Sequence, residues 1–157
     1  MQKITPCLWF NGNVDQALNL YTSVFKDAKI KNVSRYGNAG PGKPGDVMVA
    51  VFEIENQEFM ILNGGPQFPF TEAVSFTVHC ETQQEVDHYW DSLIANGGQE
   101  SQCGWLKDPF GLSWQIVPNI LGRLMTDKDP KKAGSVMQAM LQMKKIDIAK
   151  LEEAYNK

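Results

Sequence analysis

The stretch Gln102-Cys103-Gly104-Trp105-Leu106-Lys107-Asp108-Pro109-Phe110-Gly111-Leu112-Ser113-Trp114-Gln115-Ile116-Val117-Pro118 decides the fold of this chain. It predicts a strand, a tight turn and a second strand, because Asp108 opens the turn, Pro109 presets the next φ and Gly111 closes it. Gln115 stands seven residues after the turn aspartate. The side chain of this residue is a neutral amide that can both donate and accept hydrogen bonds.

A βαβββ order surrounds this stretch. A strand is expected over residues 73–80, where β-branched and aromatic residues are frequent. Thr82 and Glu85 form a capping box that opens a helix running to about Asn96, and Gly97-Gly98 ends that helix. Three further strands are expected near 99–103, 104–107 and 112–118.

The first part of the chain predicts the same order about 70 residues earlier. A strand over residues 3–10 precedes a helix that Asn13 opens, with Gln16 as its capping-box partner. Strands then follow at 28–36, 46–55 and 58–63. Asn56-Gln57 is expected to form the last hairpin turn. We therefore predict an α+β fold built from two βαβββ modules.

The residues after the second module are expected to be helical. Asp129 supplies an N-cap and Pro130 a first-turn proline. Apolar residues then recur at helical spacing, namely Val136, Met137, Met140, Leu141 and Met143. We expect this face to pack against the domain's own sheet or a dimer partner, although Met-rich faces also suit adaptable binding surfaces. One compact domain is thus divided into modules over 1–64 and 65–118 and a helical extension over 119–157.

Composition excludes several classes of protein. The chain has 157 residues, 43% of them hydrophobic, and a net charge of −3, which argues against nucleic acid because phosphate binding needs a basic face. No apolar run approaches the length of a membrane span, and the first residues offer no apolar signal core. Three widely spaced cysteines form no disulfide framework and indicate a reducing compartment. We expect a cytoplasmic protein that binds neither nucleic acid nor membrane.

Other motifs give little support for catalysis. The segment Gly37–Lys43 nearly matches a phosphate-binding loop, but Pro44 replaces the hydroxyl residue and strand-like sequence follows, so a mobile hairpin loop is expected. His79 and Cys80 are adjacent on a strand and therefore point to opposite faces, which excludes a direct Cys–His pair. His88 is expected at the surface of a helix. The sequence shows no recognisable spacing of metal ligands.

Paired βαβββ modules with a D-P-x-G turn before the last strand resemble the vicinal-oxygen-chelate superfamily, which includes the glyoxalase, dioxygenase and bleomycin-resistance proteins. The resemblance is closer to its PhnB-like branch, and it implies that the two modules form a cupped mixed sheet. It is carried by four segments: Ile4–Asn13, Leu62–Pro66, Gln102–Pro118 and Val136–Leu141. Many members of this branch carry the name 3-demethylubiquinone-9 3-methyltransferase.

The resemblance also implies where a metal would be held. Metal-dependent members of the superfamily place ligands, usually His and Glu, on the first and last strand of each module. Those places fall here on Thr5 (or Pro6), Met60, Ser75 and Gln115. Met is a soft ligand, and Ser and Thr are poor donors for a divalent ion. We therefore expect no metal site and no cofactor.

Strand alternation then predicts the lining of the cup. Gln115 places Ser113 and Val117 on the same face, while Trp114 and Ile116 face the helices. On the preceding strand, Val74, Phe76 and Val78 are expected to pack behind. The predicted ligand pocket comprises Thr5, Cys7, Trp9, Met60, Ser75, Thr77, His79, Ser113 and Gln115. The alternative is that these side chains simply fill the cup as core.

Three functions remain open from the sequence. The favoured one is a metal-free protein that binds a small molecule of unknown identity, of a sequestering or resistance type. The second is an enzyme, lyase- or isomerase-like, that uses His79, or a cofactor not visible in the sequence, as acid–base. The third is the methyltransferase activity in the branch's name. The resemblance and the apolar C-terminal helices also predict a homodimer.

Overall fold

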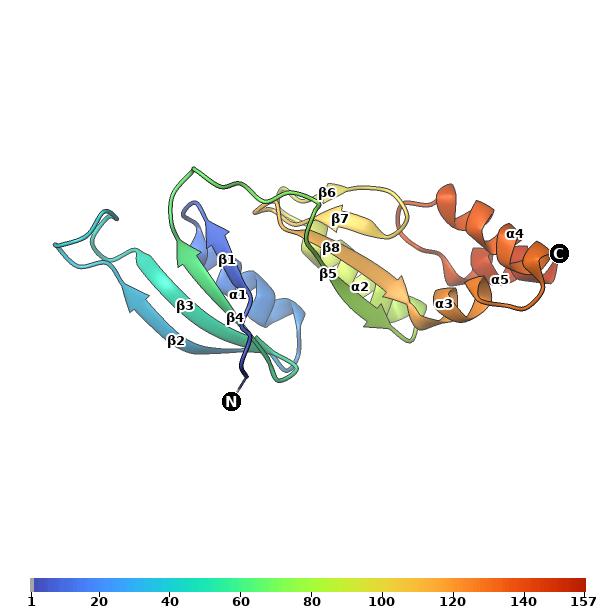
Figure 1. The fold of residues 1–157 in the computed structure, drawn as a ribbon, viewed down its shortest axis with the longest axis horizontal. Coiled ribbons are helices and arrows are strands. Elements are labelled where there is room, and N and C mark those ends of the chain that lie inside the picture. Colours follow the sequence, from blue (N-terminus) through green and yellow to red (C-terminus); the bar gives the residue numbers. More distant parts are fainter. Residues whose placement is uncertain (1) are drawn as a thin grey trace. The chain divides into compact units, whose positions relative to one another are not determined.

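The computed structural model describes residues 2–157, which separate into two compact units. The first unit runs up to Phe70 and the second begins at Thr71 (Figure 1). No helix among the described residues combines the length and apolar character needed to cross a membrane. Each unit is described here by itself.

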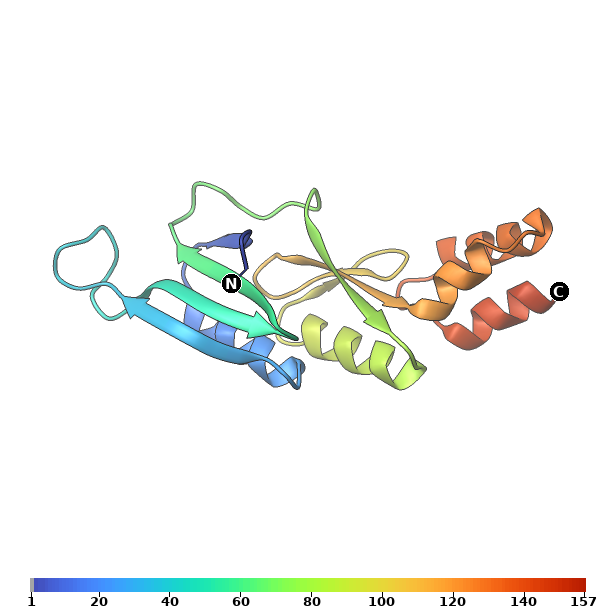
Figure 2. The same cartoon turned by 60° about the horizontal axis from the view of Figure 1, so that its bottom comes forward.

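The first unit contains one helix and one four-stranded sheet. Its elements are β1 (Cys7–Phe10), α1 (Val14–Val24), β2 (Lys29–Arg35), β3 (Val47–Ile54) and β4 (Gln57–Asn63). The strand order is β1-β4-β3-β2, in which β1 pairs with β4 in parallel and the other neighbours are antiparallel. Helix α1 lies along one face of this sheet (Figure 2). Leu8, Leu18, Tyr21 and Phe52 are among the side chains buried between them, and the Tyr21 and Phe52 rings stack at 5.6 Å.

The second unit repeats this order. Its sheet is built from β5 (Ser75–Cys80), β6 (Gln99–Glu100), β7 (Trp105–Lys107) and β8 (Ser113–Pro118), and α2 (Gln83–Ile94) follows β5. The strand order is β5-β8-β7-β6, again with one parallel pair, β5 and β8. The predicted α+β class with two βαβββ modules is therefore confirmed.

The turn at Asp108 is built around its buried carboxylate. Oδ1 accepts hydrogen bonds from the backbone N–H groups of Phe110 (2.9 Å) and Leu112 (3.1 Å), and Oδ2 accepts one from Nε1 of Trp114 (2.9 Å). The backbone N–H of Gly111 closes the turn on the Asp108 carbonyl, and Gly111 has a φ of 88°. The predicted turn chemistry is thus present, and the side chain also joins the turn to β8.

The two predicted capping boxes and the predicted hairpin turn differ in outcome. Thr82 caps α2 as expected, because its side chain accepts from the Glu85 N–H at 3.2 Å. The capping box predicted at Asn13 is wrong: Asn13 has a φ of 57° and its side chain makes no cap hydrogen bond. The hairpin between β3 and β4 turns one residue earlier than predicted, at Glu55 and Asn56, both with positive φ. That conformation matches the twist of a two-residue hairpin.

The strand predicted over 99–103 is also shorter than expected. β6 ends at Glu100, and Cys103 adopts a φ of 57° in the turn that leads to β7. The backbone N–H groups of Cys103 and Gly104 donate to the carbonyls of Met143 and Lys144, each at 2.8 Å. A segment 40 residues downstream therefore takes the hydrogen bonds that would have extended the strand.

The C-terminal part of the second unit contains α3 (Asn119–Met125), α4 (Pro130–Leu141) and α5 (Ile148–Asn156). Asp129 caps α4 as predicted, accepting from the Lys131 N–H at 2.9 Å. Their core is formed by Leu121, Val136, Met143, Ile146 and Leu151. The predicted apolar stripe is only partly buried, since Met137 is 40% exposed and Leu141 53% exposed. Both lie on the side of α4 that this core does not cover.

Candidate functional site

In each unit one side of the sheet is not covered by the helix, and we call these sides the first and the second open face. The second open face is the side of the second sheet that α2 does not cover. It carries Ser75, Thr77 and His79 on β5, Ser113, Gln115 and Val117 on β8, and Trp105 and Lys107 on β7. Register places Thr77 beside Gln115, and the Gln115 amide Nε2 donates to Ser75 Oγ at 2.9 Å. On the opposite side, Trp114 and Ile116 are buried. The face predicted from alternation therefore exists, and two of its predicted residues are in direct contact.

Ser113 differs from the other polar residues of this face because its hydroxyl is buried and unpaired among the described residues. The residue is 1% exposed, and Oγ has no hydrogen-bond partner among the described residues. Leaving a buried hydroxyl unpaired costs about 1–3 kcal/mol. A cavity of about 190 Å³ adjoins this residue, lined by Glu72, Gln99, Glu100, Ser101, Trp105, Leu106, Lys107 and Ser113. An unpaired hydroxyl therefore lies beside a cavity.

An ion pair between Lys107 and Glu72 lies at the same cavity. Both side chains are partly exposed to solvent. The hydrogen bond from Lys107 holds the pKa of the Glu72 carboxyl below its usual value. The sequence predictions missed both residues, although β-strand alternation on β7 gives the position of Lys107.

His79, the predicted acid–base residue, is exposed and no hydrogen bond or ion pair within residues 2–157 orients it. Its neighbour Cys80 is fully buried on the helix side, where burial raises the pKa of the thiol to about 12. The two side chains thus lie on opposite faces, as alternation predicts. Val74 was expected to pack behind the sheet, but it precedes β5 and is 63% exposed, so that expectation is wrong.

The first open face is the corresponding side of the first sheet. Register pairs Cys7 with Met60, and an apolar floor is completed by Val49, Val51 and Leu62. Thr5 lies outside β1, which begins at Cys7 rather than near residue 3. Pro6 accounts for this difference because it has no N–H for the strand ladder, although its carbonyl accepts from the Met60 N–H at 2.9 Å.

Trp9, also predicted to line the pocket, holds the connector that follows β4. Its indole Nε1 donates to the Gly65 carbonyl at 2.9 Å, and its ring meets Phe68 edge-on at 4.9 Å. A Cβ placed on Gly64 would lie 2.3 Å from the Trp9 ring, so the backbone approaches the indole closely. The side chain therefore has a structural role whether or not it also meets a ligand.

A cluster of ion pairs occupies one end of the first open face. Glu53 and Glu58 are opposite each other on β3 and β4. Lys29 contacts Glu53 at 3.1 Å, and Lys31 contacts Glu58 at 2.7 Å and Glu53 at 3.4 Å. The hydrogen bond from Lys29 is the main cause that lowers the pKa of Glu53. The two lysines neutralise both carboxylates, so each charged group at this end of the face already has a partner of opposite charge.

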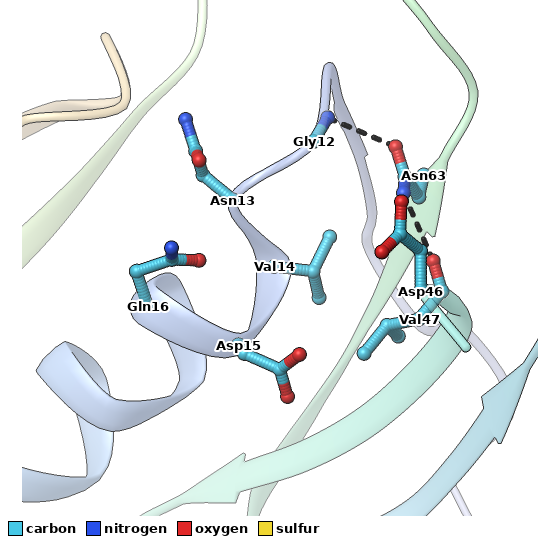
Figure 3. A pocket seen from close by; sticks show the side chains of 8 residues that line it. All are labelled: Gly12, Asn13, Val14, Asp15, Gln16, Asp46, Val47 and Asn63. Carbon is cyan, nitrogen blue, oxygen red and sulfur yellow. Dashed lines mark hydrogen bonds between the residues drawn. The ribbon is translucent and has the colours of Figure 1, made fainter. Parts of the chain in front are cut away.

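A polar cavity of about 350 Å³ lies at the start of α1. Figure 3 shows its lining residues, with Asn63 accepting from the Gly12 N–H and donating to the Val47 carbonyl, both at 2.9 Å. Asp15 and Asp46 also line it. Arg35 engages Asp15 from both guanidinium nitrogens, at 3.1 and 3.2 Å. The acidic side chains oppose binding of an anion, even though a helix begins here.

The residues at the superfamily's metal-ligand places do not fit a divalent metal. Thr5, Met60, Ser75 and Gln115 include no carboxylate and no imidazole, and Gln115 is already bonded to Ser75. Across the part of the chain that the structure describes, no three His, Cys, Asp or Glu side chains come together as a metal site.

Comparison with known proteins identifies the family. The profile of the family described as 3-demethylubiquinone-9 3-methyltransferase matches residues 2–117. The chain belongs to this family. The PhnB protein of Bacillus cereus, which carries the same family name, is 39% identical with a TM-score of 0.70; the match covers 74% of this chain and 99% of that one. The family assignment agrees with the resemblance seen in the sequence. A search of the curated proteins gives no match.

Two more distant structures share the fold alone. A protein from Pseudomonas aeruginosa is 20% identical with a TM-score of 0.61, over 75% of this chain and 98% of that one. The fosfomycin resistance protein FosX from Listeria monocytogenes, solved with Mn(II) and sulfate, is 16% identical with a TM-score of 0.52, over 74% and 92% of the two chains. The family match ends at residue 117, so α3, α4 and α5 lie outside it.

Proposed function

We propose that this protein binds a small organic molecule without a metal, through the residues of its two open faces. The observation that carries the proposal is the 2.9 Å hydrogen bond between Gln115 and Ser75. It joins two superfamily metal-ligand places by a neutral contact. The proposed contact residues are Thr5, Cys7, Trp9 and Met60 in the first unit, and Ser75, Thr77, His79, Ser113 and Gln115 in the second. They combine apolar surface with a few groups that give specificity, as small-molecule sites do.

The alternative is the enzymatic activity in the family's name. It is favoured by the 39% identity to the Bacillus cereus protein that carries that name. His79 is the single imidazole on the described open faces, and no carboxylate orients it. General acid–base catalysis relies on a positioned group, so binding is the function that this geometry supports better.

A thermal-shift screen of a metabolite library tests the proposal. A ligand that binds the native state raises the melting temperature by mass action. We expect hits in protein treated with a chelator, and the same hits to be weakened by Gln115→Leu on the second open face. Gln138→Leu on the exposed side of α4 is the matched control, since Gln138 lies outside both faces. A ligand whose binding needs an added divalent metal would contradict the metal-free proposal.

The family activity has its own test. Transfer of a methyl group from S-adenosylmethionine to a demethylated quinol would support the enzyme alternative, with loss of turnover in His79→Gln as the check on its acid–base role.

We also propose that the protein is a cytoplasmic homodimer. Light scattering at micromolar concentration measures the oligomeric state, and a monomer mass would contradict the dimer.

A further inference from the structure

The unpaired hydroxyl of Ser113 belongs to a row of polar side chains that crosses the second open face. Register places Gln99 opposite Lys107, Lys107 opposite Ser113, and Ser113 opposite Ser75. These residues come from four adjacent strands and point to one side of the sheet. Ser75 is engaged by Gln115, whereas Ser113 has no partner within the described chain. The row therefore contains a buried donor that the described part of the protein does not use.

Lys107 is the cation of this row, and its partner is readily exchanged. Its one ion pair among the described residues is with Glu72. The Glu72 side chain is 61% exposed and lies in the connector just before β5, outside any strand or helix. Partly exposed ion pairs of this kind contribute little to stability. A carboxylate that approaches from solvent could therefore replace the carboxylate of Glu72.

We propose that this row binds a carboxylate group of the ligand, with Lys107 Nζ and Ser113 Oγ as the donors. In the absence of ligand, the Glu72 carboxylate forms the ion pair with Lys107, and the ligand displaces it. This inference rests on the proposed small-molecule function and names the class of its ligand. A carboxylate accepts several hydrogen bonds and pairs with an ammonium through charge-assisted ones. Displacement of Glu72 frees the ammonium of Lys107, which lies opposite Ser113 on the neighbouring strand. The ligand carboxylate then also supplies the acceptor that the Ser113 hydroxyl lacks.

The rest of the cavity supports a singly charged acid with an apolar body. Trp105 lines the same 190 Å³ cavity and supplies an aromatic wall. Glu100 also lines it, but its carboxylate accepts from Trp90 Nε1 and contacts Lys144, on the side of the sheet opposite Lys107. A single ammonium suits a monoanion better than a phosphate dianion, which needs more donors. The chemistry therefore favours a monocarboxylate.

Benzoate, with neutral benzamide as its isostere, tests this inference. Chemical shifts of backbone amides over residues 99–115 of the full chain report binding in an NMR titration. We expect benzoate to bind at least about fivefold tighter than benzamide, because a charge-assisted contact is worth about that much. Glu72→Gln should tighten benzoate binding by a similar factor, and Lys107→Met should remove the preference for benzoate over benzamide. Glu152→Gln and Lys26→Met are the matched charge controls, at exposed positions.

Ser113→Ala separates a binding role from a structural one. The substitution removes an unpaired hydroxyl, so the melting temperature should stay the same or rise. Benzoate binding should nevertheless weaken several-fold, while benzamide binding is unchanged. Equal benzoate affinities for Glu72→Gln and Glu152→Gln, or a Ser113→Ala variant that binds benzoate like the wild type, would overturn the inference.

The outcome also distinguishes this inference from the proposed function. Neutral metabolites that shift the amides of β5 and β8, combined with no preference for benzoate, would overturn the carboxylate site and leave small-molecule binding in place. If neither acidic nor neutral compounds shift the amides of either open face, both proposals are wrong.

Discussion

The two open faces share one backbone plan and differ in chemistry. The strand orders β1-β4-β3-β2 and β5-β8-β7-β6 match, including the single parallel pair in each sheet. The first face has an apolar floor around Met60 and Leu62 and an ion-pair cluster whose charges are all matched. The second carries hydroxyl and amide groups, and one of its hydroxyls is unpaired. The two modules therefore share a backbone arrangement and present different side-chain chemistry on it.

The difference is clearest where the two modules correspond. The place of Gln115 in the second module is taken by Met60 in the first, and that of Ser75 by Thr5. Gln115 reaches Ser75 through a hydrogen bond, whereas Met60 has no polar hydrogen to donate to Thr5. Similarly, Trp9 holds a connector through its indole, while His79 at the corresponding strand position is exposed. Side chains at equivalent places thus support structure in one module and offer groups to solvent in the other.

The cysteines give the largest expected contrast between the modules. Cys7 is exposed on the first open face, while Cys80 is buried and has a pKa raised to about 12 from an ordinary value of 9.0. Raising a thiol pKa by this amount reduces its thiolate fraction about a thousandfold at neutral pH. We expect a thiol reagent at pH 8 to modify Cys7 readily and Cys80 only after unfolding. Peptide mass spectrometry with Cys7→Ser as control measures this, and early labelling of Cys80 would break the contrast.

Asp108→Ala should cause the largest loss of stability, because the second module depends on this buried carboxylate and the first has no such turn. Three N–H donors, those of Phe110, Leu112 and Trp114, lose their acceptor. We expect the free energy of unfolding to fall by about 3 kcal/mol or more, measured by urea denaturation. Asp46→Ala, at an exposed aspartate of the first module, is the control. A similar loss in both variants would show that the Asp108 turn is not special.

Gly64→Ala tests the corresponding anchor in the first module. The added methyl would lie 2.3 Å from the Trp9 ring, so the indole or the connector must shift. Overpacking of this kind costs about 1–3 kcal/mol, and the fluorescence of the tryptophan environment should change as well. Gly37→Ala is the matched control, since nothing lies within 4 Å of its added methyl. Equal stabilities of the two variants would sink the close-packing explanation.

The ion pairs of the first open face should give the smallest effect. The contact with Lys29 lowers the pKa of Glu53 below its ordinary value of 4.5. A lowered folded-state pKa adds stability above the unfolded-state value, and this contribution is lost as the pH falls through the folded-state pKa. Glu53→Gln should therefore be slightly less stable than the wild type at pH 7, and the difference should vanish in acid. A pH series of melting temperatures measures it, with Glu152→Gln as control.

Two predictions failed because of residues that are distant in the sequence. The fold class, the Asp108 turn, the Thr82 cap and the alternation around Gln115 were predictable because each depends on a few neighbouring residues. The strand expected through Cys103 ends early because Met143 and Lys144 accept its N–H groups. The apolar stripe that begins on α4 divides because Val136, Met140 and Met143 belong to or pack against the C-terminal core, whereas Met137 and Leu141 are exposed. Neither set of contacts is visible in a local window of sequence.

The sequence by itself determined the two-module order and which side chains share each face, because strand alternation and turn geometry are local properties of the chain. Only the tertiary structure decided which of those side chains already have partners. It joined Gln115 to Ser75 on the neighbouring strand and Lys107 to Glu72 in the connector before β5, and it left the hydroxyl of Ser113 unpaired among the described residues. Hydrogen bonds and burial depend on residues brought together by folding, and these are what turn a predicted face into a candidate site.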